Sequence, residues 1–213
     1  MRSRLSPILW LIFAAGTCTA KVHVIAFGKW STVQAGEKAA SLKVRTLLVD
    51  AQVKEYVFGA PHDVTERLFV VRRAFRVNDS LPDELSTRWQ WQRGGWLLVD
   101  RMTGKISAVN LPEFDPVYSA ASWYRDYIAY CGVSDDQKKV FAVVAQLNRR
   151  KPVLHKAISG GAIDDNAKQE PACTAPEWQR GPVRVSFDAG NAKQTFAVHG
   201  KAVDPVSVDD EEE

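Results

Sequence analysis

Apolar residues recur along this chain at every second position or in short uninterrupted runs, and both patterns are typical of β-strands. The runs are rich in valine, isoleucine and aromatic residues, which favour strands. Segments 80–86 and 113–121 have some helical character, but no segment keeps a helical period for three turns. The predicted strands cover residues 22–27, 42–49, 53–58, 67–77, 88–92, 96–100, 106–109, 118–124, 127–131, 140–145, 153–156, 183–187 and 195–199. The pattern therefore predicts an all-β fold.

Turn-forming residues separate these runs and indicate antiparallel hairpins. Segment 100–105 lies between two apolar runs, and its Gly104 can take the positive φ that closes a tight hairpin. Segments 134–139 and 188–191 are polar and also lie between two apolar runs, so they predict turns as well. The longest internal loop is predicted from Gly160 to Pro176.

A short sequence repeats inside the chain. Leu-Leu-Val-Asp occurs at 47–50 and again at 97–100, and a looser copy, Val-Val-Ala-Gln, occurs at 143–146. Each copy is followed by a turn and a second predicted strand. Spacings of this size match one four-stranded blade of a β-propeller.

Two segments resemble the blades of TolB-like and WD-repeat propellers. Residues 133–143 are similar to the strand, Ser-x-Asp-Gly turn and strand of such a blade, with Gln137 where the family favours glycine. Residues 184–198 resemble a second blade, and residues 100–106 resemble the outer half of another. The resemblance implies propeller-like stacked β-meanders and a binding role. A β-sandwich built from the same meanders is the alternative.

The first twenty residues are typical of a signal peptide. Arg2 and Arg4 precede a short apolar run at 8–15, and Cys18, Thr19 and Ala20 offer small residues at the cleavage site. The run is about half the ~20 residues that span a bilayer, so no stable membrane span is expected. We predict a signal peptide at 1–20, one all-β domain at 21–203 and periplasmic or extracellular location.

Charge is unevenly distributed along the chain. Loss of Arg2 and Arg4 lowers the formal net charge from +3 to +1, which argues against a nucleic-acid partner. Residues 204–213 carry six carboxylates and no lysine or arginine, so an acidic disordered tail is predicted there.

Two cysteines, Cys131 and Cys173, follow the signal peptide. In an oxidising compartment an even pair predicts a disulfide, which would close a loop of about 40 residues. Two unpaired thiols, one of them buried, are the alternative.

Tryptophans and arginines provide the candidate ligand-binding residues. Alternation along a strand places Trp89, Trp91 and Arg93 on one face, where indole rings can stack on a sugar or a peptide side chain. The same large rings also suit a core between sheets. Arg72 and Arg76 share a face of the preceding strand, either as a protected sheet edge or as a reader of anionic groups.

Catalytic motifs have little support in the sequence. The four histidines lack metal-ligand spacing, and the only histidine beside a carboxylate is His62, next to Asp63, in a predicted loop. There is no nucleophile elbow and no phosphate-binding glycine loop. We therefore predict no cofactor and no metal site. The expected function is an exported non-catalytic binding or protein-interaction module for an envelope protein or glycan; a secreted hydrolase acting on glycans or peptides is the alternative.

Overall fold

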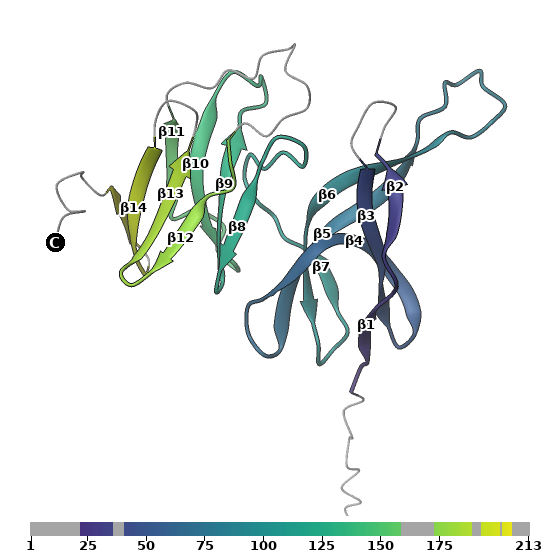
Figure 1. The fold of residues 1–213 in the computed structure, drawn as a ribbon, viewed down its shortest axis with the longest axis horizontal. Coiled ribbons are helices and arrows are strands. Elements are labelled where there is room, and N and C mark those ends of the chain that lie inside the picture. The colour runs from purple at the N-terminus through teal and green to yellow at the C-terminus, as the bar shows by residue number, and fades with distance from the viewer. Residues whose placement is uncertain (1–21, 36–40, 159–172, 189–192, 201, 206–213) are drawn as a thin grey trace, which may run out of the picture.

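The chain folds into three antiparallel β-sheets (Figure 1), which confirms the predicted all-β class. The structure is a computed structural model that describes residues 22–35, 41–158, 173–188, 193–200 and 202–205. The described residues include no helix long and apolar enough to cross a membrane. The sheets in this part of the chain are open meanders and are not closed into a ring.

Sheet A has seven strands in the order β1-β3-β4-β5-β6-β7, with β2 also paired to β3. Its strands are β1 (Ile25–Phe27), β2 (Ser31–Gln34), β3 (Ser41–Val49), β4 (Gln52–Asp63), β5 (Leu68–Asn78), β6 (Trp89–Asp100) and β7 (Ile106–Ala108).

Sheets B and C are four-stranded meanders with the orders β11-β10-β9-β8 and β12-β13-β14-β15. Sheet B contains β8 (Ala121–Tyr124), β9 (Tyr127–Val133), β10 (Val140–Gln146) and β11 (Leu154–Ile158). Sheet C contains β12 (Glu177–Arg180), β13 (Val183–Asp188), β14 (Lys193–His199) and β15 (Ala202–Pro205).

Sheet B is the middle layer, because apolar side chains cover both of its faces. One face packs on sheet C through a cluster that includes Ala142, Val185 and Phe196. The opposite face packs on sheet A through a second cluster that includes Val70 and Trp96. Strands buried on both faces are continuous apolar runs, which explains the uninterrupted sequence of β9.

Sheet A has apolar clusters on both faces as well. One face carries Leu47, Val71 and Leu97 in a cluster that Ile25 and Ile106 cover. The other face carries Leu42, Val44 and Ala74, with Tyr56, Phe58 and Trp91 packed on them. Strand β2 lies close to β6 at this second cluster.

A β-bulge interrupts the pairing of β5 with β6. Arg72 pairs with Trp96 and Ala74 pairs with Arg93, so Gly94 and Gly95 lie opposite the single residue Arg73. A Cβ on Gly94 would approach the Arg73 carbonyl oxygen to 3.0 Å. This close contact between backbones explains why glycine occupies the bulge.

Cys131 and Cys173 lie at disulfide distance, with their Cα atoms 6.2 Å apart, as the even cysteine count predicts. Both are buried in the cluster between sheets B and C. The pair therefore joins β9 to the segment that leads into sheet C.

Several predicted element boundaries need correction. The predicted strands 88–92 and 96–100 are one strand, β6, because a bulge and not a turn contains the glycine pair. The predictions omit β2, β12 and β15, which are short and contain few apolar residues. Segments 80–86 and 113–121 form no helix. Strand β15 includes Asp204 and Pro205 of the predicted tail, and residues 1–21 and 206–213 lie outside the described part of the chain.

The repeated Leu-Leu-Val-Asp sequence lies twice in sheet A, at the ends of β3 and β6. Its offset therefore does not separate two sheets. An aspartate closes each copy: Asp50, directly after β3, accepts a hydrogen bond from Val24 N–H, and Asp100, the last residue of β6, accepts one from Met102 N–H. The predicted hairpin after Asp100 is present, with Gly104 at φ 64°. Gln137 also adopts a positive φ, of 57°, at the position where propeller blades favour glycine.

Asp100 also pairs with Arg67 through two hydrogen bonds of 2.9 and 2.5 Å, and this hydrogen bonding holds the pKa of the Asp100 carboxyl well below its usual range. A depressed carboxyl pKa contributes stability above the pKa of the unfolded chain, about 3.9, and loses it as pH falls toward the lower value in the folded state. We expect Asp100→Asn to reduce the loss of stability on acidification below about pH 4. Denaturant unfolding at a series of pH values checks this. Parallel pH profiles for Asp100→Asn and the wild type would contradict it.

We expect the double substitution Cys131→Ala, Cys173→Ala to lower the free energy of unfolding by about 4 kcal/mol, because the unfolded chain would lose a cross-link over a long loop. Urea unfolding measures the change. Reductant should destabilise the wild type and leave the double variant unchanged. Alkylation of Cys131 in denatured, unreduced protein would contradict the pairing.

Candidate functional site

The hairpin of β5 and β6 extends beyond the rest of sheet A (Figure 1). Strand β4 pairs with β5 only as far as Ala74, whereas β5 and β6 remain paired as far as Asn78 and Trp89. We call residues 76–91 the arm. Its tip, residues 79–88, connects the two strands.

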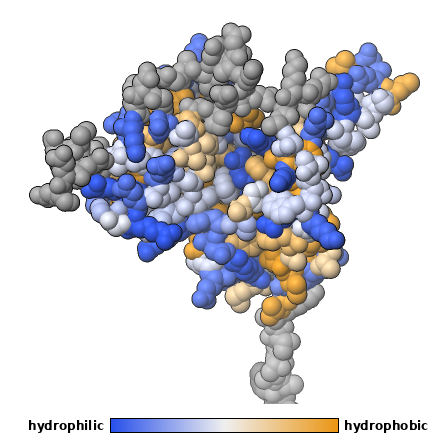
Figure 2. All heavy atoms as spheres, viewed as in Figure 1, coloured by the Kyte–Doolittle hydropathy of each residue, from blue (hydrophilic) through white to orange (hydrophobic). Residues whose placement is uncertain are grey.

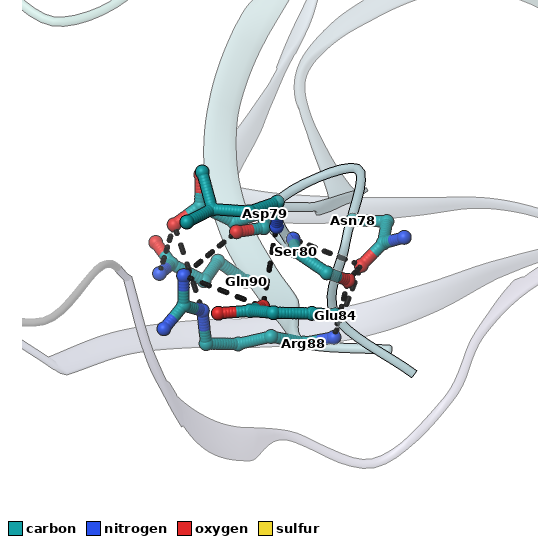
Figure 3. Close-up of polar contacts among 7 residues, drawn as sticks. Asn78, Asp79, Ser80, Glu84, Arg88 and Gln90 are labelled. Carbon is teal, nitrogen blue, oxygen red and sulfur yellow. Dashed lines mark hydrogen bonds and ion pairs between the residues drawn. The ribbon is translucent and has the colours of Figure 1, made fainter. Parts of the chain in front are cut away.

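Side-chain hydrogen bonds order the tip (Figure 3). The Asn78 Oδ1 atom accepts from the backbone N–H groups of Ser80 and Arg88, at 3.2 and 3.0 Å, and from the Ser80 hydroxyl. Such bonds between an asparagine and nearby backbone groups stabilise turns. Asn78 thereby holds the two ends of the tip together.

A second group of contacts crosses the arm (Figure 3). Arg88 donates to the Asp79 carbonyl at 2.8 Å, and the Gln90 amide donates to the Asp79 carboxylate at 2.7 Å. Glu84 accepts from Leu81 N–H at 3.2 Å and lies 3.9 Å from Arg88. Each surface contact contributes little energy alone, but together they favour one shape for the tip.

The arm exposes large apolar side chains on its ordered tip and at the start of β6. Leu81 is 60% exposed, Leu85 107% and Trp89 57%. Figure 2 shows small hydrophobic groups among hydrophilic residues at the end of the arm. Exposed leucine side chains gain nothing from folding, so two of them on an ordered tip make this end of the arm a candidate contact surface.

Arg76 links the two tryptophans at the base of the arm. Its guanidinium carbon lies 5.7 Å from the centre of the Trp89 ring and 5.5 Å from that of Trp91. Trp91 in turn packs edge-on against Tyr56, with ring centres 5.0 Å apart. Trp91 is therefore anchored in the sheet A core, and the exposed Trp89 continues the same stack toward the tip.

The strand register places all five predicted site residues on one face of sheet A: Arg72, Arg76, Trp89, Trp91 and Arg93. Only Arg76, Trp89 and Trp91 form one stack. Arg93 pairs with Ala74 and is exposed.

Arg72 lies away from this stack, where sheet A meets the segment before sheet B. Its guanidinium donates to the carbonyl oxygens of Gly94 and Pro116 at 3.1 and 3.0 Å and lies over the Phe114 ring. Burial, together with the charge of Arg93, lowers the pKa of Arg72 to about 10. These contacts give Arg72 a structural role at the boundary between the sheets.

Sequence reasoning missed Leu81 and Leu85. Neither alternates with other apolar residues, so nothing in the local pattern distinguishes them from ordinary loop residues. The polar residues around them, from Asn78 to Gln90, are the available signal, because several can bond to the backbone of a turn.

The histidines form separate contacts. His155 and Glu113 are 2.6 Å apart, and His23 and Asp50 are 2.9 Å apart. His62 was predicted in a loop but lies in β4, where its Nε2 is 2.8 Å from the Arg125 carbonyl oxygen and its ring stacks on Trp123. In the described part of the chain, no serine, threonine or cysteine bonds to these histidines, and no three potential ligands are grouped for a metal ion.

Comparison of the chain with models of known protein families, with curated protein sequences and with solved structures finds no match. The arm is therefore interpreted from its own geometry.

The two tryptophans should respond differently to truncation. We expect Trp91→Ala to lower the free energy of unfolding by about 3 kcal/mol, because it leaves a cavity beside Tyr56. Trp89→Ala should cost less than about 1 kcal/mol, because most of its ring is in water. Urea unfolding of both variants tests this, and equal losses would contradict the division between core and surface.

Proposed function

We propose that this chain is an exported, non-catalytic binding module that recognises a protein partner through the arm. The observation that carries the proposal is an ordered tip that exposes two leucines, with an exposed tryptophan directly beside it. Hydrogen bonds already restrict the tip before a partner binds, so less conformational entropy is lost when the complex forms.

The exposed side chains favour a protein over a glycan as the partner. Trp89 and Arg76 suit either ligand, since a stacked indole and guanidinium can contact a sugar ring or an aromatic side chain. Leu81 and Leu85 contribute only apolar surface and need an apolar pocket to bury it. Proteins supply such pockets, often around a few anchoring side chains.

Charge further defines the partner. The tip carries Asp79, Asp83 and Glu84 against one cation, Arg88. A negatively charged tip is repelled by anionic lipid headgroups and attracted to basic residues. The expected receptor site is an apolar pocket with a basic rim.

Export is supported by the sequence and by the cysteines. Residues 1–20 have the basic, apolar and small-residue regions of a signal peptide. Cys131 and Cys173 lie at disulfide distance, an arrangement suited to an oxidising compartment. The partner is therefore sought among exported and envelope proteins.

The proposal predicts that removing two exposed apolar side chains of the arm strongly reduces partner capture and leaves the fold intact. The tagged chain serves as bait in the exported protein fraction of its own source, and quantitative mass spectrometry measures what it retains. We expect Leu85→Ser with Trp89→Ser to reduce capture of a specific protein by about tenfold or more, as for loss of an anchoring contact.

Val53→Ser with Met102→Ser is the matched control. Val53 and Met102 are also more than half exposed, but lie in β4 and in the β6–β7 turn. This control should capture the same protein as the wild type. Equal capture by wild type, control and arm variant would overturn the proposed function.

A further inference from the structure

Strand β7 is an open edge of sheet A. It pairs with β6, and no other described strand lies on its far side. Asp100 N–H donates to the Lys105 carbonyl at 3.0 Å, and Val109 N–H donates to the Trp96 carbonyl at 2.8 Å. Because bonding alternates along an antiparallel pair, Ser107 also faces β6, whereas Ile106 and Ala108 direct their backbone N–H and C=O groups toward the open edge.

Two clefts adjoin β7, one on each face of the sheet. The first has a volume of about 550 Å³ and lies on the face that carries Leu98, between the segment after β7 and the β10–β11 turn. The second, of about 360 Å³, lies on the face that carries Leu97. Ser107 and Ala108 line both clefts. The open backbone groups of β7 therefore lie between two hollows.

This arrangement fits an added β-strand. Side chains of a strand point alternately to opposite faces of its sheet. A strand paired with β7 would direct successive side chains alternately to the face of the first cleft and to the face of the second. Recognition by strand addition uses the same two elements: backbone bonds to a free edge, and pockets for alternate side chains.

Charge in the clefts favours acidic side chains. Arg149 and Arg150 line the first cleft, and neither forms an ion pair with another described residue. Lys54 and Arg73 line the second, where Glu55 pairs with Arg73 at 2.9 Å. Four cationic groups thus accompany one carboxylate. Such a lining attracts anionic groups.

We propose that β7 is the docking edge for an extended acidic segment of a partner protein, which joins sheet A as an additional strand. Backbone bonds to Ile106 and Ala108 provide the pairing. The cations of the clefts select aspartate and glutamate in the added strand. This site is separate from the arm, so the two proposals stand independently.

A designed peptide tests the proposal directly. The probe is a fluorescein-labelled octapeptide of four Val-Glu repeats, and its binding to the purified full chain is measured by fluorescence anisotropy. Four Val-Lys repeats form the control peptide. We expect saturable binding of the acidic peptide that weakens as salt concentration rises, because exposed charges are screened. No saturable binding of the acidic peptide, or equal binding of both peptides, would overturn the proposal.

Ala108→Pro tests the backbone pairing. Proline removes the N–H that faces the open edge and leaves the bonds to β6, so it is tolerated at such a position. We expect it to weaken peptide binding about tenfold, as for loss of a backbone anchor at a β-edge. Ala108→Ser keeps the N–H and should bind within about twofold of the wild type. Unchanged binding by a folded Ala108→Pro variant would overturn strand addition.

Arg149→Glu with Arg150→Glu tests the charge selection without altering β7. It should weaken binding of the acidic peptide about tenfold or more, since like charges would then meet. The matched control, Lys138→Glu with Lys139→Glu, makes the same charge change in the opposite turn of β10 and should leave binding unchanged. Equal losses from both charge reversals would overturn selection by the cleft and indicate a general field effect.

Two further measurements test whether a second copy of the chain occupies the β7 edge and whether the peptide binds at the arm instead. Analytical ultracentrifugation measures the oligomeric state of the wild type and of Ala108→Pro. A dimer of the wild type that Ala108→Pro abolishes would overturn the proposal, because a second copy would then occupy the edge. Loss of peptide binding in the arm variant Leu85→Ser, Trp89→Ser would overturn it as well. Retained peptide binding in that variant supports a separate site, whatever the result for partner capture.

Discussion

Strands β9 and β10 present apolar side chains to both faces of sheet B, and each face must be protected from water. Sheet C covers one face, around Ala142 and Phe196, and sheet A covers the other, around Val70 and Trp96. The order of the layers, with sheet B between sheets A and C, follows from this single requirement. The Cys131–Cys173 pair lies on the side toward sheet C, where a long segment separates the two partners in the sequence.

The contact with sheet B occupies only part of sheet A. Trp96 and Leu98 belong to that contact, while Trp91, on the same face of β6, packs within sheet A against Tyr56. Arg72 lies between these regions and bonds to backbone carbonyls on both sides. Beyond Trp91, no other sheet of the described chain packs on the hairpin. Apart from Trp91 at its base, the arm is therefore the portion of β5 and β6 that the core does not use, and it is available for a different role.

The all-β class and most strands follow from alternation and β-branched runs, because a buried sheet face needs such residues at every second position. The faces of Trp89, Trp91 and Arg93 were predictable for the same reason. The continuity of β6 was not predictable from the pattern, since Gly94 and Gly95 are equally typical of a turn and of a bulge. Strands β2 and β12 are also hidden in the sequence, because pairing with a neighbour rather than burial defines them.

The candidate binding surfaces were also only partly predictable from the sequence. The shared face of Trp89 and Trp91 was predictable, but the place of Arg76 beside them depends on the β5–β6 register. The exposure of Trp89 depends on where β4 stops pairing. Leu85 was not predictable, since its full exposure depends on a network of side chains that closes only in three dimensions. Likewise, nothing in the sequence indicates that the β10–β11 turn lies beside β7, because they meet only through the packing of sheet A on sheet B.

The bulge at Gly94 and Gly95 has a consequence for how this chain can change over evolution. Trp91 and Trp96 are separated by an odd number of positions, so a regular strand would direct them to opposite faces of sheet A; the extra residue brings both to the same face. Loss of one glycine would leave a regular strand in which the two tryptophans, then four positions apart, still share a face. One residue inserted into each strand beyond the bulge would instead turn the arm over and exchange its aromatic side with the side that carries Gln90 and Gln92. Lengthening both strands of the arm by two residues would preserve its orientation. Such a hairpin can vary in length only in pairs of residues, whereas its tip is free to vary in sequence.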